Sequence, residues 1–197
     1  MEREITVTER ESGILTKQLP LINRINDGRL RDLVIKVWVM LWRESPYHDI
    51  SEAPNYTTEL IGKDDETLVR HTNAVVKMSE AIARQFQQAY GSNLNYDMLL
   101  AGSLVHDIDK LVLYERQGDS VQLSELGRRE SHGEYGAIVA EQVGFPQTIV
   151  NIIASHSPTL RKTLPATIEA VFVACCDEAN FQSYRLMTGK GLWRKLE

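Results

Sequence analysis

The sequence predicts an all-α protein. In several separate segments apolar residues recur at intervals of three and four, the spacing that places them on one face of a helix. Short stretches rich in glycine, proline and asparagine separate these segments, and the chain has no internal repeat. We therefore expect a bundle of five or six core helices joined by short connections.

Length and composition indicate one soluble domain. The 197 residues are 43% hydrophobic and 25% charged, which is typical of globular proteins with one substantial core. The net charge of −5 disfavours a nucleic-acid polymer as partner. The charged N-terminus and the lack of an apolar run of roughly 18 residues argue against secretion and a membrane partner. Adjacent Cys175 and Cys176 suit buried free thiols, so we expect a cytoplasmic protein.

The first 60 residues are expected to extend the core. Residues 1 to about 14 alternate weakly and predict a frayed arm or a short edge strand. A helix with one apolar face is predicted from Leu30 to Trp42, after an Asn-Asp-Gly turn. The segment 45–54 predicts a loop because it is rich in proline and acidic residues. This loop contains His48, which we expect to be a surface residue.

Two central helices should follow. A long helix is predicted from Asp65 to Tyr90, ended by a glycine. Asn95 or Asn93 can cap a second helix that is apolar nearly all round to Val105, so this helix belongs in the interior. The helical period is then lost, and a short hairpin or an irregular lid is expected at about 111–125. In the long helix predicted from Asp65 to Tyr90, the residues expected on the single apolar face are Leu68, His71, Val75, Met78, Ile82 and Phe86.

Three further helices are expected in the C-terminal third. Ser131 and Glu134 have the spacing of a capping box and open the first. Pro146 can open the second. Residues Thr163–Pro165 are expected to start a last long helix. Its buried face should comprise Ile168, Val171, Phe172 and Cys175.

Six ionisable residues interrupt or end these apolar faces. A buried carboxylate needs a cationic partner, because taking an unpaired charge out of water is costly. Imidazoles and carboxylates that converge between helices are typical of metal sites. The donors suffice for one or two divalent transition metal ions (Fe, Mn, Ni, Co or Zn) that share one carboxylate. The six residues are His71, His106, Asp107, His132, His156 and Asp177.

A purely structural role is the common explanation for any one of these residues. A single histidine on an apolar face usually binds a backbone carbonyl, and a single aspartate in a helix is usually solvated or caps the helix. Four of the five histidines of the chain occupy such positions here, beside two interior aspartates. Coincidence is therefore the weaker explanation for the whole set.

The spaced set of six resembles that of the HD-domain superfamily of metal-dependent phosphohydrolases. Residues 106–110, His-Asp-Ile-Asp-Lys, are similar to its His-Asp-Ile-Gly-Lys signature. The resemblance covers about 66–180 and implies a single HD-type domain over 1–197, with an N-terminal extension (1–60) and a short C-terminal tail. Asp109 stands where the signature has glycine, and we expect its side chain to face solvent or to pair with Lys110.

The resemblance also implies the ligand sets. A first metal site would comprise His71, His106, Asp107 and Asp177. His132 and His156 would hold a second ion, with Asp107 as the bridge. Asp107 and Lys110 are then the catalytic candidates, with Lys110 contacting the substrate phosphate as a mobile point charge.

The implied function is hydrolysis of a phosphoric ester or anhydride by a metal-bound hydroxide. The enzyme would be a phosphatase, phosphodiesterase or pyrophosphatase acting on a nucleotide or another small phosphorylated compound. Two alternatives stay open: a di-iron oxygenase of the same superfamily, and a ligand-binding module without turnover. A homodimer is also left open. Further phosphate contacts are conceivable at Arg128, Arg129, Arg161 and Lys162, although a solvated surface role is the commoner one.

Overall fold

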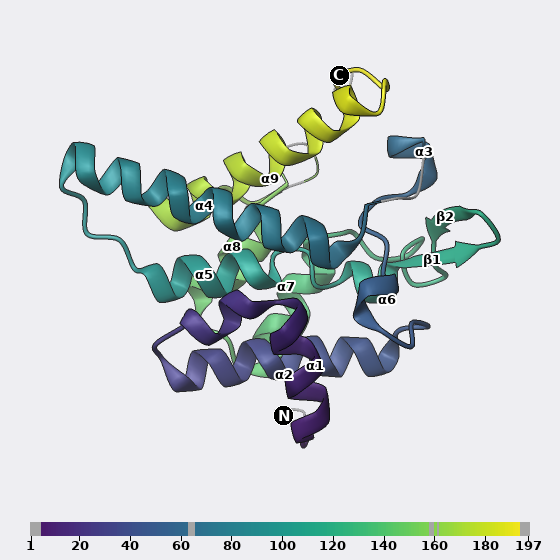
Figure 1. The fold of residues 1–197 in the computed structure, drawn as a ribbon, viewed down its shortest axis with the longest axis horizontal. Coiled ribbons are helices and arrows are strands. Elements are labelled where there is room, and N and C mark those ends of the chain that lie inside the picture. Colours follow the sequence, from purple (N-terminus) through teal and green to yellow (C-terminus); the bar gives the residue numbers. More distant parts are fainter. Residues whose placement is uncertain (1–4, 63–65, 158–159, 161, 194–197) are drawn as a thin grey trace.

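A computed structural model describes residues 5–62, 66–157, 160 and 162–193, and these are mostly helical (Figure 1). The all-α prediction is therefore confirmed. The single short hairpin predicted near 111–125 is present in this part of the chain and is formed by β1 and β2. In chain order the elements are α1 (Glu9–Gln18), η1 (Pro20–Arg24), α2 (Gly28–Glu44), η2 (Ile50–Glu52), α3 (Thr58–Ile61), α4 (Leu68–Tyr90), α5 (Tyr96–Val105), α6 (Lys110–Leu113), β1 (Tyr114–Gln117), β2 (Ser120–Leu123), α7 (Glu134–Val143), α8 (Gln147–Ser155) and α9 (Ile168–Met187).

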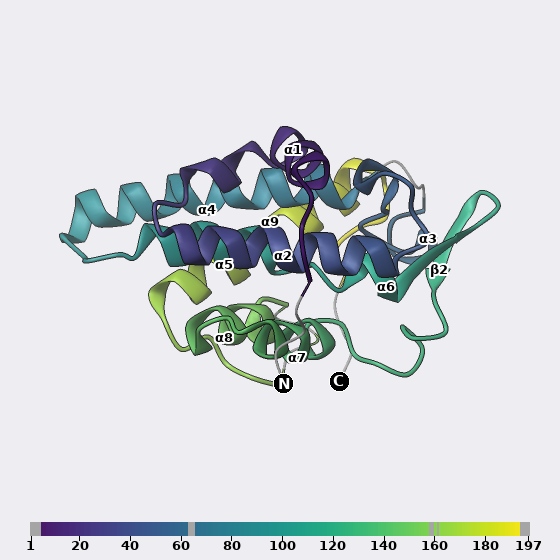
Figure 2. The ribbon, with the colours of Figure 1, turned by 90° about the horizontal axis from the view of Figure 1, so that it is seen from below.

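Helix α5 lies at the centre of the fold, as its uniform hydrophobicity predicts. It contacts α2, α4, α8 and α9, and every residue from Leu99 to Val105 is buried. Figure 2 shows α1 and α4 on one side of the layer that contains α2 and α5, and α7 with α8 on the other side. Residues that immediately follow α5 are therefore surrounded by helices from several parts of the chain.

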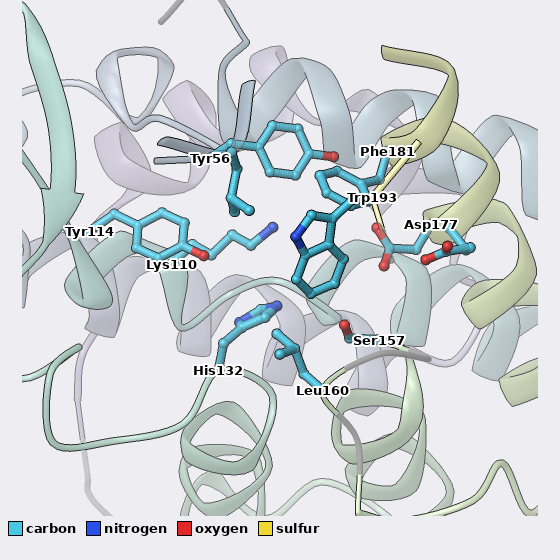
Figure 3. A pocket seen from close by; sticks show the side chains of 11 residues that line it. Tyr56, Lys110, Tyr114, His132, Ser157, Leu160, Asp177, Phe181 and Trp193 are labelled. Carbon is cyan, nitrogen blue, oxygen red and sulfur yellow. The ribbon is translucent and has the colours of Figure 1, made fainter. Parts of the chain in front are cut away.

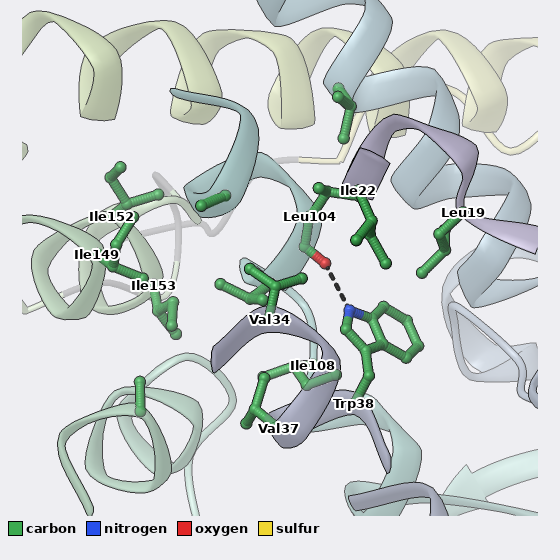
Figure 4. Close-up of a cluster of buried hydrophobic side chains, with 14 of the residues drawn as sticks. Leu19, Ile22, Val34, Val37, Trp38, Leu104, Ile108, Ile149, Ile152 and Ile153 are labelled. Atoms are coloured by element: carbon green, nitrogen blue, oxygen red, sulfur yellow. Dashed lines mark hydrogen bonds between the residues drawn. The ribbon is translucent and has the colours of Figure 1, made fainter. Parts of the chain in front are cut away.

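Helix α2 joins the N-terminal extension to this centre. Trp38 is 1% exposed, and its indole Nε1 donates a hydrogen bond of 2.9 Å to the backbone oxygen of Leu104 (Figure 4). That carbonyl belongs to the last turn of α5, where backbone oxygens have no partner within the helix. The extension thus fixes the end of α5, two residues before His106.

The cap predicted at the start of α5 and the glycine predicted at the end of α4 are present. Asn95 accepts a hydrogen bond from the backbone nitrogen of Met98 at the start of α5. Thr67 caps α4, and Gly91 ends it in a left-handed conformation with φ of 65°. Helix α4 begins at Leu68, later than the predicted start at Asp65, a residue outside the described part of the chain. Within the described part of the chain, no helix has the length and hydrophobicity needed to cross a bilayer.

The expectation of an arm or strand at the N-terminus was wrong for residues 9–14, because α1 already begins at Glu9. Thr8 and Glu11 form a reciprocal capping box, and Leu15 is fully buried on the inner face of the helix. The two polar capping residues and the charged outer face hid the helical period in a short segment.

The starts of α7 and α9 also differ from the predictions. Ser131 does not cap α7, which begins at Glu134 after Gly133, a residue with φ of 80°. Helix α9 begins at Ile168 with Thr167 as its cap, after the predicted start at Thr163–Pro165.

The buried face of α9 is rotated relative to the predicted one. Ile168 and Val171 are 41% and 43% exposed, and Ile82 on the neighbouring α4 is 42% exposed. Of the two free cysteines only Cys176 is buried, whereas Cys175 is exposed. With this rotation, the buried face of α9 contains the carboxylate of Asp177 together with Val173 and Cys176.

Candidate metal centre and active site

The structure brings all six predicted metal ligands together. They form two groups that share Asp107, and within each group the candidate ligand atoms lie within 4.8 Å of one another. Their role as metal ligands stays a prediction. The first group is His71, His106, Asp107 and Asp177, and the second is Asp107, His132 and His156.

Two of the histidines are oriented by the ends of their own helices. His106 directly follows α5, and its Nδ1 donates to the backbone oxygen of Ser103 at 2.7 Å. His156 directly follows α8, and its Nδ1 donates to the oxygen of Ile153 at 2.6 Å. Each ring thus satisfies a carbonyl that the helix leaves without a partner. The proton assigned to Nδ1 by this contact leaves the Nε2 lone pair available as a ligand.

The other two histidines are oriented by side chains from distant elements. His71, in the first turn of α4, has its Nδ1 2.9 Å from Oδ1 of Asn180 on α9. His132 precedes α7, and its Nδ1 lies 2.8 Å from Oδ1 of Asp109. All four Nδ1 atoms therefore have an acceptor, and all four Nε2 atoms turn toward Asp107. This donor arrangement is the one that metal-binding histidines require.

The carboxylate of Asp107 lies between the two groups. Its Oδ2 is 3.1 Å from Nε2 of His71, and its Oδ1 is 3.0 Å from Nε2 of His132 and 3.2 Å from Nε2 of His156. Although buried, Oδ1 has no hydrogen bond of good geometry among the described residues. An orphaned anionic oxygen that faces imidazole nitrogens fits a cation site better than a hydrogen-bonded core. The residues present therefore fit one or two divalent ions.

Opposite effects act on the protonation of the cluster. Burial lowers the pKa of His71, but its hydrogen bonds to Asp107 and Asp177 outweigh burial and raise this pKa to about 9. Burial raises the pKa of Asp177, but the hydrogen bond to His71 outweighs burial and lowers this pKa to about 2. The cluster thus requires positive charge, and a metal ion that binds at neutral pH must displace a proton from His71.

Lys110 is the cation nearest to this carboxylate. Its Nζ donates to Oδ2 of Asp107 at 2.6 Å and to Oδ1 of Asn55 at 3.2 Å, and it lies 4.8 Å from the ring centre of Tyr56. The residue is 4% exposed. Lys110 lines a pocket together with Asp177 and His132, so the sequence places it correctly beside the cluster.

The pocket opens beside the cluster and has aromatic walls (Figure 3). Its volume, with the solvent at its open mouth included, is about 460 Å³. Phe181 of α9 packs edge-on against Trp193 and lies against Tyr56. The lining residues are Tyr56, Leu60, Lys110, Tyr114, His132, Ser157, Leu160, Asp177, Glu178, Phe181 and Trp193.

The other basic candidates in the described part of the chain do not line this pocket. His48 is exposed, as predicted, and its backbone nitrogen donates to Glu52. Arg128 donates to the backbone oxygen of Leu123, and Lys162 forms an ion pair with Glu134 at 2.9 Å. Arg129 is also on the surface, 3.9 Å from Glu125, and Arg161 lies outside the described residues.

The prediction for Asp109 was wrong. Its side chain is fully buried and contacts His132 and the backbone of α7 instead of solvent or Lys110. Sequence reasoning also missed Asn55, Tyr56 and Asn180. Only Asn180 had a usable pattern, because it follows Asp177 by three positions and so lies on the same helical face.

Comparison with known proteins agrees with this geometry. The HD domain family matches residues 68–179. A dihydroneopterin 2',3'-cyclic phosphate phosphodiesterase of Methanocaldococcus jannaschii is 32% identical over 113 residues, which are 57% of this chain and 45% of that protein. A ribonuclease Y of Mesoplasma florum is 23% identical over 188 residues, 90% of this chain and 33% of that protein. The chain thus aligns with less than half the length of either relative.

No solved structure matches the chain. The family match nevertheless covers more than half of the sequence and includes all six clustered residues. The chain therefore belongs to the HD domain family.

Proposed function

We propose that the protein is a metal-dependent phosphohydrolase that acts on a small phosphorylated compound. The observation that carries the proposal is the Asp107-centred cluster at the inner end of a pocket that also presents the Lys110 ammonium. When bound, a divalent ion lowers the pKa of its water to about 7 and neutralises charge on phosphoryl oxygens. The match to a phosphodiesterase of the same family supports this chemistry.

The residues of the chain have distinct roles in this proposal. Asp107, Asp177 and the four Nε2 atoms would hold the one or two ions, and Asp107 belongs to both groups of ligands. Lys110 has three N–H bonds, of which Asp107 and Asn55 occupy two. The third can donate to a phosphate oxygen in the pocket, because Nζ points into the pocket (Figure 3). No nucleophilic side chain is required.

The aromatic walls favour a substrate with a flat ring, such as a nucleotide. Trp193 is held at the pocket by two hydrogen bonds of 2.8 Å with the side chain of Gln182, one from its backbone nitrogen and one to its backbone oxygen. Phe181 and Tyr56 complete the apolar side, and Tyr56 also lies against His71 and Lys110 of the cluster. A base or similar ring can stack there while its phosphate reaches Lys110. A 2',3'-cyclic nucleotide is the first candidate, by analogy with the M. jannaschii relative.

The test combines metal analysis with a product-release screen. Protein purified without added metal is analysed for its elements, then assayed anaerobically with Mn²⁺ or Ni²⁺. The panel contains 2',3'-cyclic nucleotides, nucleoside mono-, di- and triphosphates, a ring-free phosphoester and a short RNA. We expect turnover of small esters, loss of both ions and of turnover in Asp107→Ala, and neither loss in the matched control His48→Ala.

Three results would contradict the proposal. Turnover that requires iron and oxygen would assign the protein to the oxygenases of the superfamily. A metal-loaded protein that is inert toward the whole panel would favour a binding module. Cleavage of the RNA without cleavage of any small compound would contradict the substrate class.

A further inference from the structure

Asp109 makes three contacts with the segment that carries His132. Its Oδ1 lies 2.8 Å from Nδ1 of His132, and its Oδ2 accepts hydrogen bonds from the backbone nitrogens of Gly133 at 2.8 Å and Gly136 at 3.1 Å. The side chain is fully buried. One carboxylate thus holds both the ring of His132 and the first turn of α7, which has no N-cap side chain of its own.

Two glycines permit this approach. A Cβ added at Gly136 would lie 3.2 Å from the carboxylate of Asp109 and 3.0 Å from Cγ2 of Ile153. Gly133 has φ of 80°, a conformation that side chains other than glycine rarely adopt. A side chain at Gly133 would strain the backbone, and one at Gly136 would press on the carboxylate and on Ile153.

Among the four clustered histidines, His132 alone has an anion as the acceptor of its Nδ1 proton. His106 and His156 use backbone oxygens, and His71 uses the neutral amide of Asn180. A carboxylate binds the N–H more strongly than these neutral acceptors do and makes the opposite nitrogen a better electron donor. His132 also needs an external support, because it precedes α7 whereas His106 and His156 are tied to the last turns of helices.

We propose that Asp109 is a positioning residue for the second metal site, where it holds Nε2 of His132 toward Asp107 and strengthens it as a ligand. The inference rests on the metal binding put forward under the proposed function. It does not depend on which reaction the ions support. It also gives a role to a carboxylate at the position where the His-Asp-Ile-Gly-Lys signature has glycine.

The test is a double-mutant cycle on metal affinity. Asp109→Asn keeps the size of the side chain but must turn an NH₂ group either to the two backbone N–H groups or to Nδ1 of His132. We expect binding of the second Mn²⁺ equivalent, measured by equilibrium dialysis and elemental analysis, to weaken about 10- to 100-fold. Binding of the first equivalent should stay within about threefold of the wild type, a spread of the size that unperturbed sites show.

Coupling to His132 separates positioning from a purely structural role. In a His132→Ala background, Asp109→Asn should cause no further loss of metal affinity, because the ligand that it positions is absent. The matched variant Asn180→Ala should instead weaken the first equivalent, since Asn180 supports His71. Gly136→Ala, which presses on the same carboxylate, should weaken the second equivalent in the same direction as Asp109→Asn.

Three results would overturn the proposal. Asp109→Asn could weaken binding of both Mn²⁺ equivalents equally, or it could cause the same loss of metal affinity in the His132→Ala background as in the wild type. The wild type could also bind a single ion. Folding of each variant is checked by its circular dichroism and melting temperature. All readouts are metal occupancies, so a protein that binds two ions as expected but hydrolyses no phosphoester would contradict the proposed function and leave the role of Asp109 supported.

Discussion

Replacing Lys110 by methionine should have opposite effects on stability and on metal affinity. Methionine preserves the length and most of the apolar contacts of the side chain, but it removes the ammonium that donates to Asp107 at 2.6 Å. Asp107, 2% exposed, would lose its closest cationic partner. The metal-free protein should therefore be destabilised, whereas bound ions should compensate the carboxylate in its place.

The size of both effects follows from the burial of the pair. Breaking a buried ion pair costs about 3 to 5 kcal/mol, and the lower end applies here because His71 still contacts Asp107. A loss of about 3 kcal/mol lowers the melting temperature of a chain of this length by roughly 6 to 12 °C. If bound metal reduces the loss to about 1 kcal/mol, linkage makes metal binding tighter by about 2 kcal/mol, or roughly 30-fold. Turnover should nevertheless fall, because the phosphate contact is lost.

The assay is thermal unfolding of wild type and Lys110→Met, each in EDTA and in saturating Mn²⁺, followed by metal titration. The matched control is Lys77→Met, which removes an exposed lysine on α4 and should change neither quantity. Equal losses of melting temperature in EDTA and in Mn²⁺ would refute the reasoning, as would unchanged metal affinity.

Two further changes test the scaffold around the site. Glu80→Gln removes a carboxylate whose pKa is lowered chiefly by its hydrogen bond to Arg24. In EDTA at pH 7 it should cost about 1 kcal/mol of unfolding free energy. This difference should shrink as the pH falls below the ordinary glutamate value of 4.5, and it should vanish only below the lowered pKa of the folded protein, where the wild-type group is protonated in both states. A constant difference down to low pH would contradict this electrostatic origin. Trp38→Phe leaves the buried oxygen of Leu104 without its donor and opens a small void. Chemical denaturation should therefore show that the free energy of unfolding falls by about 2 to 3 kcal/mol. A fall below about 0.5 kcal/mol would show that the extension does not support the end of α5.

The helices that could be predicted were those whose packing follows from the order of apolar and capping residues within the helix itself. The interior position of α5 was readable because its residues are apolar nearly all round, and its start was readable because Asn95 supplies the cap. The start of α7 was misread for the opposite reason. Ser131 and Glu134 have the right spacing, but Asp109, more than 20 positions away, accepts the backbone N–H of Gly133, one of the groups that such a cap could satisfy, and also that of Gly136.

The sequence by itself determined the fold class and the six residues that converge, because an ionisable side chain on an apolar helical face has few reasons to be there. Only the tertiary structure decided how each ring is oriented, which residues line the pocket and what Asp109 contacts. Those contacts join side chains from distant segments, such as His71 with Asn180 and His132 with Asp109. Local periodicity carries no information on such pairs, since they form only when the packed helices fix the separation and direction of both side chains.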